Sequence, residues 1–242
     1  MSGPGRGGAR LPALTITLGL TVVTVLAFAA QLLSGWVFGF DVVAGLGAKV
    51  NRAIAAGQVW RLVTPLFVHG GIVHLLVNMY SLNVLGPLVE RLFGPRRMLA
   101  LYLLAGVGGS VASLALTPAA SVGASGAIFG LLGALAAFLA LHRRALGPAG
   151  RLQLRQLAFV ALLNLGLGLT PGIDNAAHLG GLISGAALAA AAGPRMRLVP
   201  IDLEYARWQD ARPWEQAWPR LAAGAAVLVA LAWIAAQAAG GG

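Results

Sequence analysis

The sequence predicts an all-α membrane protein, a polytopic helical bundle with seven transmembrane helices, and three observations support this fold class. First, 58% of the 242 residues are hydrophobic and only 10% are charged, whereas soluble domains are about one-quarter charged. Second, most of the basic residues gather at every second junction between the apolar stretches. Third, stretches long enough to cross a bilayer recur along the chain. They lie near residues 11 to 34, 72 to 90, 98 to 116, 125 to 141, 156 to 172, 176 to 193 and 221 to 238.

The distribution of basic residues predicts how the chain is threaded through the membrane. Of the 17 lysines and arginines, all but Lys49, Arg52 and Arg61 fall on the side of the N-terminus, and these three share one loop on the opposite side. Because basic residues accumulate on the cytoplasmic side, we expect a cytoplasmic N-terminus and an outside C-terminus. The net charge of +10 does not predict nucleic-acid binding, because no basic stripe with interleaved aromatic residues accompanies it.

The first apolar segment has two interpretations. Ala27-Phe28-Ala29 could be the cleavage site of a signal peptide. However, the apolar run exceeds the roughly 7 to 15 residues of a signal core, so a first membrane helix fits better. We therefore expect a cytoplasmic tail over residues 1–11 and a core of six transmembrane helices over residues 12–193.

The segments outside the core spans differ in length and composition, and the first loop is the most informative of them. The first loop, residues 35–71, is long for an unstructured connection and is a candidate functional element. Its Trp60 and Arg61 could belong to an interfacial aromatic belt with a snorkelling arginine, or could have a specific role. The remaining segments are a cytoplasmic linker (194–220), the seventh transmembrane helix (221–238) and a tail (239–242).

Four polar residues within the predicted spans are candidates for function, because polar groups are costly in a membrane. Ser125 and His178 lie about 16 and 15 residues before the cytoplasmic ends of their spans, which places both about 22 to 24 Å above that face at 1.5 Å per residue. His74 and Asn78 lie at about 26 and 20 Å on the same scale. Ser125 and His178 therefore share one level in the outer part of the bilayer, and His74 and Asn78 lie just above and just below it.

Ser125 is expected at or near the start of its helix, after Gly123 and Ala124. A helix N-terminus offers unpaired backbone N–H groups and the positive end of the helix dipole, both suited to a developing oxyanion. The alternative is that Ser125 merely caps the helix.

Glycines predict how this helix packs against the sixth span. His178, Gly181 and Gly185 lie on one face of the sixth span, and Gly126 and Gly130 form a matching seam on the fourth. Small residues allow two backbones to approach closely. We therefore expect the seam to bring Ser125 and His178 within hydrogen-bonding reach.

Neutral His178 could accept the proton of the Ser125 hydroxyl and return it to the leaving amine, as in serine hydrolysis. Asp174 precedes the sixth span in a loop and Glu90 ends the second span, so neither is placed to complete a triad and a two-residue dyad is more economical. Phe129 follows Ser125 by one helical turn and is expected to orient His178 by packing against it.

His74 and Asn78 are four residues apart on one helical face, where they could donate hydrogen bonds to the same oxyanion or form a structural hydrogen bond between helices. A metal site built from His69 and His74 is not expected, because no carboxylate or HExxH pattern accompanies them. The chain has no cysteine, and we expect neither a metal nor another cofactor.

Together these motifs resemble the rhomboid family of intramembrane serine proteases over residues 12–193. The resemblance depends on the order of several motifs, each weak alone. They are Trp60-Arg61, His69, His74-x-x-x-Asn78, Glu90 with Gly94, Gly123-x-Ser125-Gly126 and Ala177-His178-x-x-Gly181-x-x-x-Gly185.

The resemblance implies a six-helix rhomboid core with one added C-terminal helix, and a Ser125–His178 dyad in a water-filled cavity that opens outward. It assigns the oxyanion hole to His74 and Asn78 with the backbone of Ser125 and Ala124. It also implies a membrane-embedded first loop and transmembrane protein substrates. Some relatives have Tyr where this chain has Phe129, so a phenolic hydrogen bond is lost while stacking is retained.

Two other functions are compatible with the sequence. A non-proteolytic rhomboid-like protein would bind membrane proteins without cutting them, and a small transporter would use the polar residues to line a solute path. The retention of both Ser125 and His178 favours the protease. The composition, rich in Ala, Gly, Leu and Arg, favours a bacterial plasma membrane.

Overall fold

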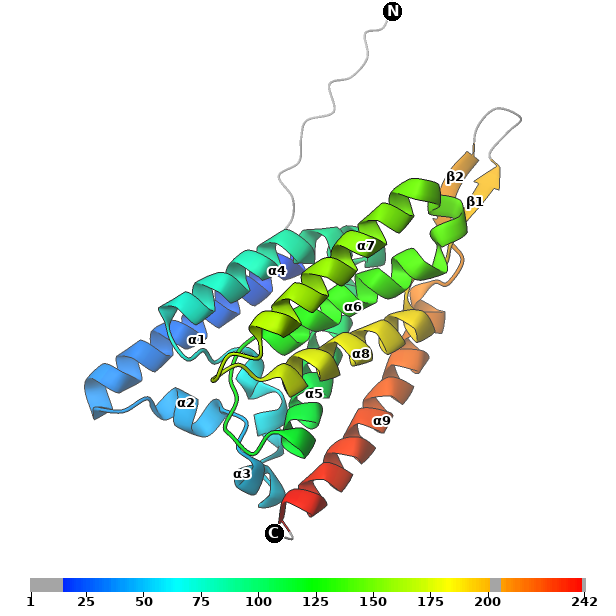
Figure 1. Cartoon of the computed structure of the whole chain (residues 1–242). Coiled ribbons are helices and arrows are strands. Elements are labelled where there is room, and N and C mark those ends of the chain that lie inside the picture. The colour runs from blue at the N-terminus through cyan, green and yellow to red at the C-terminus, as the bar shows by residue number, and fades with distance from the viewer. Residues whose placement is uncertain (1–14, 201–205, 241–242) are drawn as a thin grey trace, which may run out of the picture.

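The computed structural model describes residues 15–200 and 206–240, and seven long helices dominate this part of the chain (Figure 1). They are α1 (Ile16–Phe38), α4 (Ile72–Phe93), α5 (Pro95–Leu116), α6 (Ser125–Leu141), α7 (Arg143–Leu167), α8 (Asn175–Ala192) and α9 (Trp214–Gly240). Among them α1, α4, α5, α8 and α9 are long and apolar enough to cross a membrane, and α6 is apolar but only 17 residues long. The structure confirms the predicted all-α polytopic fold class.

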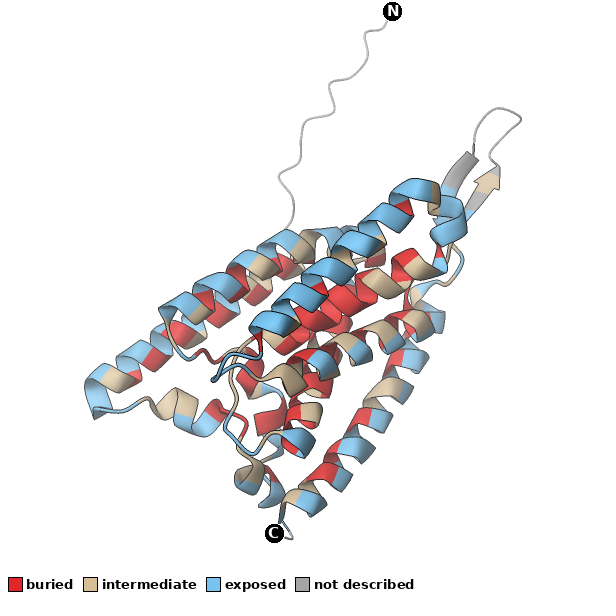
Figure 2. Ribbon diagram, viewed as in Figure 1, coloured by how far each residue is buried: buried red, intermediate tan, exposed pale blue. Residues whose placement is uncertain are grey.

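Helices α5, α6 and α8 form the centre of the bundle, and α1, α4, α7 and α9 lie around it (Figures 1 and 2). Helix α6 is apolar on every side and most of its residues are buried, as expected of a helix surrounded by others. The outer helices expose large apolar side chains, such as Leu26 on α1 and Trp233 on α9. Such surfaces are suited to lipid, since a soluble monomer rarely leaves them uncovered.

The glycine seam between α6 and α8 has the predicted close packing. A Cβ atom added to Gly181 would overlap the carbonyl oxygen of Gly126, and one added to Gly185 would overlap that of Gly130. Because only glycine permits this approach, the two helix backbones lie in direct contact along the seam.

The first loop is structured by four short helices, and α1 extends into the predicted loop as far as Phe38. The short helices are α2 (Val42–Gly47), α3 (Asn51–Ala55), η1 (Val59–Leu62) and η2 (Thr64–Leu66). The interpretation of Arg61 as a snorkelling residue is wrong. Its buried guanidinium donates to the carbonyls of Ala48 at 2.8 Å and Gly45 at 2.9 Å, inside the loop. Trp60 is half-exposed and donates to the carbonyl of Leu46 at 3.2 Å.

The predicted linker 194–220 contains elements that the sequence did not indicate. Strands β1 (Met196–Pro200) and β2 (Ala206–Asp210) pair antiparallel, and Asp210 accepts a hydrogen bond from buried Arg97 of α5 at 2.8 Å. Helix α9 begins at Trp214 rather than at 221, because its first two turns carry polar residues that an apolar-run criterion excludes. It continues to Gly240, so only residues 241–242 of the predicted tail, like residues 1–14, lie outside the described residues.

The bounds of the fifth span, 156–172, also require correction. Helix α7 begins at Arg143, interrupted at Gly147 by a positive φ of 59° before Pro148, and ends at Leu167. The arginine-rich first half of α7 is helical without being apolar, which the hydropathy criterion cannot detect.

Candidate active site

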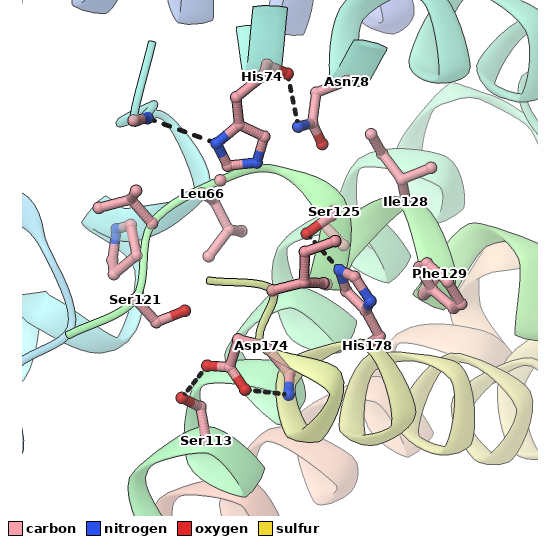
Figure 3. A pocket seen from close by; sticks show the side chains of 18 of the residues that line it. Leu66, His74, Asn78, Ser113, Ser121, Ser125, Ile128, Phe129, Asp174 and His178 are labelled. Carbon is pink, nitrogen blue, oxygen red and sulfur yellow. Dashed lines mark hydrogen bonds between the residues drawn. The ribbon is translucent and has the colours of Figure 1, made fainter. Parts of the chain in front are cut away.

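The side chains of Ser125 on α6 and His178 on α8 point toward each other, as the sequence predicts (Figure 3). The distance from Ser125 Oγ to His178 Nε2 is 2.8 Å. Ser125 is the first residue of α6, and Ala124, not Ser125, occupies the N-cap position. The alternative of a mere capping serine is therefore wrong, because the hydroxyl bonds to the imidazole of another helix.

The imidazole of His178 is held by packing on one face. The rings of Phe129 and His178 are stacked, with centroids 4.4 Å apart and an angle of 6° between their planes. His178 is buried, and its Nδ1 atom has no hydrogen-bond partner in the described part of the chain. The arrangement is therefore a serine–histidine pair without an acidic third member in contact with the ring.

His74 and Asn78 of α4 face the pair from the opposite wall (Figure 3). The backbone N–H of Gly70 lies 3.4 Å from His74 Nδ1, which favours that atom as the acceptor and Nε2 as the atom that carries the proton. Asn78 Nδ2 donates one hydrogen to the carbonyl of His74 at 2.9 Å and carries a second. Both residues can therefore supply an N–H group to the space above Ser125.

Gly123 permits this approach of α4. A Cβ atom there would lie 2.6 Å from His74 Cε1 and 2.7 Å from His74 Nε2. The φ angle of Gly123 is 122°, a value that side chains disfavour. Its backbone N–H donates to the carbonyl of Pro65 at 2.9 Å, which fixes the segment before Ser125 against the first loop.

These four polar residues line a cavity of about 620 Å³. At about 30 Å³ per water molecule, this volume holds both water and part of a peptide. Gly123, Gly126 and Phe129 also line it, whereas the side chain of Ala124 is fully buried and is not among the described lining residues. Trp60, Arg61, Gly181 and Gly185 are not among its described lining residues, so the first two stabilise the loop and the last two the helix seam.

The carboxylate of Asp174, which the sequence predicts to lie in a loop, also lines this cavity. Asp174 is the N-cap of α8, four residues before His178, and its carboxylate accepts a hydrogen bond from the Ser113 hydroxyl. Burial alone would raise the pKa of Asp174, but hydrogen bonds from Ser113 and the Ala177 backbone and the charge of Lys49 hold it below its ordinary value. An acidic residue directly before the predicted helix was the signal that could have identified it.

His69 lies beside the site without joining it. Its buried ring is edge-on to that of His74, with centroids 5.1 Å apart, and burial followed by the nearby His74 lowers the pKa of His69 to about 4. Among the described residues, no group of three or more histidine and acidic side chains could hold a metal ion.

Comparisons with known proteins agree with the resemblance. A profile of the family described as "Rhomboid domain" matches residues 56–195. The chain is 41% identical over 184 residues to "Rhomboid protease GluP" of Bacillus subtilis, covering 74% of this chain and 35% of that protein. It is 34% identical over 177 residues to "Putative rhomboid protease YdcA" of the same organism, covering 72% and 85%. "RHOMBOID-like protein 5" of Arabidopsis thaliana is 42% identical over 144 residues, covering 58% and 46%. The chain thus spans less than half the length of GluP and of the plant protein.

Proposed function

Because this chain belongs to the rhomboid family, we propose that it is an intramembrane serine endopeptidase that cleaves transmembrane protein substrates with a Ser125–His178 dyad. The observation that carries the proposal is the 2.8 Å separation of Ser125 Oγ and His178 Nε2 in a cavity between helices. Relatives named as rhomboid proteases support the reaction class.

In the first step, Ser125 donates its proton to His178 Nε2 as its oxygen attacks the carbonyl carbon of the scissile peptide bond. The protonated imidazole then gives that proton to the leaving nitrogen, and the C–N bond breaks to leave an ester on Ser125. Water in the cavity next loses a proton to His178 and attacks the ester. The proton returns to Ser125 as the second product departs.

Each tetrahedral intermediate places a negative charge on the former carbonyl oxygen. His74 Nε2–H and the amide of Asn78 are the side-chain donors that we assign to this oxyanion, with the backbone N–H groups of Ala124 and Ser125. The positive end of the α6 dipole points to the same place. These groups are fixed by the fold before the substrate binds, so little reorganisation accompanies the reaction.

The orientation follows from the charge distribution. With the N-terminus in the cytoplasm and the C-terminus outside, the start of α6 and the start of α8 both face outward. The cavity then lies in the outer half of the membrane, where transmembrane substrates can enter it from the bilayer. We assign the chain to a bacterial plasma membrane on its composition.

The test is cleavage of a transmembrane substrate by the purified protein in liposomes. We expect cleavage by the wild type and its loss, by a factor of at least ~10³, in Ser125→Ala and in His178→Ala. A serine-directed phosphonate should label the wild type and not Ser125→Ala. Cleavage by either variant at the wild-type rate would reject the dyad, and a wild type that binds the substrate without cutting it would favour the non-proteolytic alternative.

A further inference from the structure

Two charged side chains that the proposed chemistry does not use converge on one helix end beside the cavity. Lys49 comes from the first loop and Asp174 from the start of α8, and both bond to the last turn of α5. Lys49 is fully buried, and a buried charge is costly unless polar partners satisfy it. The hydrogen-bond partners of Lys49 and of Asp174 therefore indicate which segment of the chain each residue holds in place.

Lys49 holds the segment that leads to the nucleophile. Its ammonium group donates to the carbonyl oxygens of Thr117 at 2.8 Å and Ala119 at 2.7 Å, and to that of Ser113 at 3.4 Å. The carbonyls of Ser113 and Thr117 belong to the C-terminal end of α5, where a cation is stabilised, and that of Ala119 follows it in the chain. The backbone of Lys49 also pairs with Ser121 in both directions, at 2.9 and 3.1 Å. Ser121 precedes Ser125 by four residues.

Asp174 holds the helix that carries the base (Figure 3). One carboxylate oxygen caps α8 by accepting from the Ala177 N–H at 3.0 Å, and it also accepts from the Thr117 hydroxyl at 3.2 Å. The other oxygen accepts from the Ser113 hydroxyl. Since His178 follows Asp174 by one helical turn, these bonds set the position of the first turn of α8 relative to α5.

The segment before Ser125 and the start of the helix that carries His178 are thus both anchored to the same turn of α5, from Ser113 to Thr117. We propose that Asp174 and Lys49 are positioning residues that keep His178 and Ser125 at bonding distance by anchoring their two segments to this common helix end. Neither residue touches the reacting atoms. The inference rests on the proposed function, because position matters here only if the pair performs chemistry.

Positioning has a large effect on rate, since a displacement of about 1 Å can lower a rate about a hundredfold. The ammonium of Lys49 and the carboxylate of Asp174 also attract each other, which draws the two segments together. A glycine seam fixes α6 against α8 below this level, whereas the loops above the dyad are held by hydrogen bonds, among them the backbone pair of Lys49 with Ser121. The side chains of Lys49 and Asp174 add the bonds that join these loops to α5.

The first test compares Asp174→Ala with Asp174→Asn. We expect the alanine variant to lower both kcat and the rate of phosphonate labelling of Ser125 at least tenfold, with KM changed less than twofold. Asparagine can still cap the helix and bond to the α5 hydroxyls, so Asp174→Asn should recover most of the rate. Thr15→Ala is the matched control, because Thr15 caps α1 through its side chain at 3.2 Å, far along the chain from the dyad.

Two further variants keep the test decisive if Asp174→Ala does not fold. Thr117→Val preserves shape and removes one hydroxyl bond to Asp174, so kcat should fall two- to fivefold. Lys49→Met removes the ammonium group while retaining the length of the side chain, and we expect a tenfold loss of labelling rate.

The outcomes separate the inference from the proposed function. A wild type that neither cleaves nor labels would refute the proposed function itself. An active wild type whose Asp174, Thr117 and Lys49 variants match Thr15→Ala in kcat and labelling rate would overturn the positioning role, whatever their thermal stability.

Discussion

Helices α6 and α7 border the same cavity, but the bundle holds them very differently. Twelve of the 17 residues of α6 are buried, whereas only Gly150 and Ala161 are buried among the 25 residues of α7. Asn164 and Leu167 of α7 nevertheless line the cavity that contains Ser125. The dyad therefore lies between the tightly packed helices α6 and α8, and the loosely packed α7 forms another wall.

The difference in packing between α6 and α7 follows from the size of the side chains at the helix contacts. Glycines let the α6 and α8 backbones touch, and the overlap that any Cβ atom would cause leaves little freedom to shift. The second half of α7 exposes large apolar side chains, such as those of Phe159 and Leu162. A polar bond from Asn175 to the Leu165 carbonyl, 2.9 Å long, ties the end of α7 to α8. Elements with few buried contacts open at low free energy, so movement is expected on the α7 side.

The largest effect is expected from Gly185→Ala in the seam. The added methyl group overlaps the Gly130 carbonyl, so the two helices must separate. Overpacking of this kind costs about 3 kcal/mol, the upper part of the usual range. We expect a lower midpoint of thermal unfolding in detergent and loss of cleavage.

Gly166→Ala on α7 is the matched control for that substitution. Gly166 is exposed, and a Cβ atom there meets nothing within 4 Å. Alanine in place of a helical glycine should leave stability unchanged or raise it by about 0.4 to 1 kcal/mol. Equal thermal midpoints for Gly185→Ala and Gly166→Ala would remove the distinction between the two walls.

Asn78→Ala tests the α4 wall, which is intermediate in burial. Loss of one oxyanion donor should lower kcat about tenfold to a thousandfold, or about 1.4 to 4 kcal/mol in activation free energy. Asn83→Ala on the same helix is the control, because Asn83 bonds to Thr21 of α1 at 3.0 Å and does not line the cavity. Wild-type turnover in Asn78→Ala would make Asn78 a structural residue.

The tightly packed side of the cavity could be predicted from the sequence, and much of the rest could not. Polar residues in apolar spans and glycines at helical spacing report directly on burial, so Ser125, His178 and the seam were identified. The hairpin of β1 and β2, the first turns of α9 and the polar half of α7 lie outside apolar runs, so hydropathy cannot detect them.

The partners of Lys49 and Asp174 were missed for a different reason. The carbonyls that satisfy Lys49 lie more than sixty residues away in the chain, and their identity as partners depends on the tertiary fold. A lysine in a loop therefore looked like any surface charge. The two interpretations of Arg61 could not be separated for the same reason, because its acceptors are backbone carbonyls that a sequence pattern does not distinguish.

His69→Gln tests how pH acts on the segment that leads into α4. The pKa of His69 is about 4 in the fold, through burial and then the neighbouring His74, against an ordinary value of 6.5. Between these values the unfolded chain binds a proton that the folded protein does not, so this residue makes stability rise with pH. From pH 7 to pH 5 the wild type should lose about 1 to 2 kcal/mol more than His69→Gln. Parallel stability curves for the two proteins, measured by thermal unfolding, would contradict this assignment.

The smallest effect concerns the stacking that holds His178 on the rigid side. Phe129→Leu keeps an apolar side chain and removes the stacked ring, so kcat should fall about two- to tenfold, corresponding to about 0.5 to 1.5 kcal/mol for an aromatic pair. Phe138→Leu is the control, since Phe138 packs on His142 with centroids 4.2 Å apart at the other end of α6. Both variants should lose similar stability, but only Phe129→Leu should slow phosphonate labelling of Ser125. Equal labelling rates would mean that the glycine seam alone positions the imidazole.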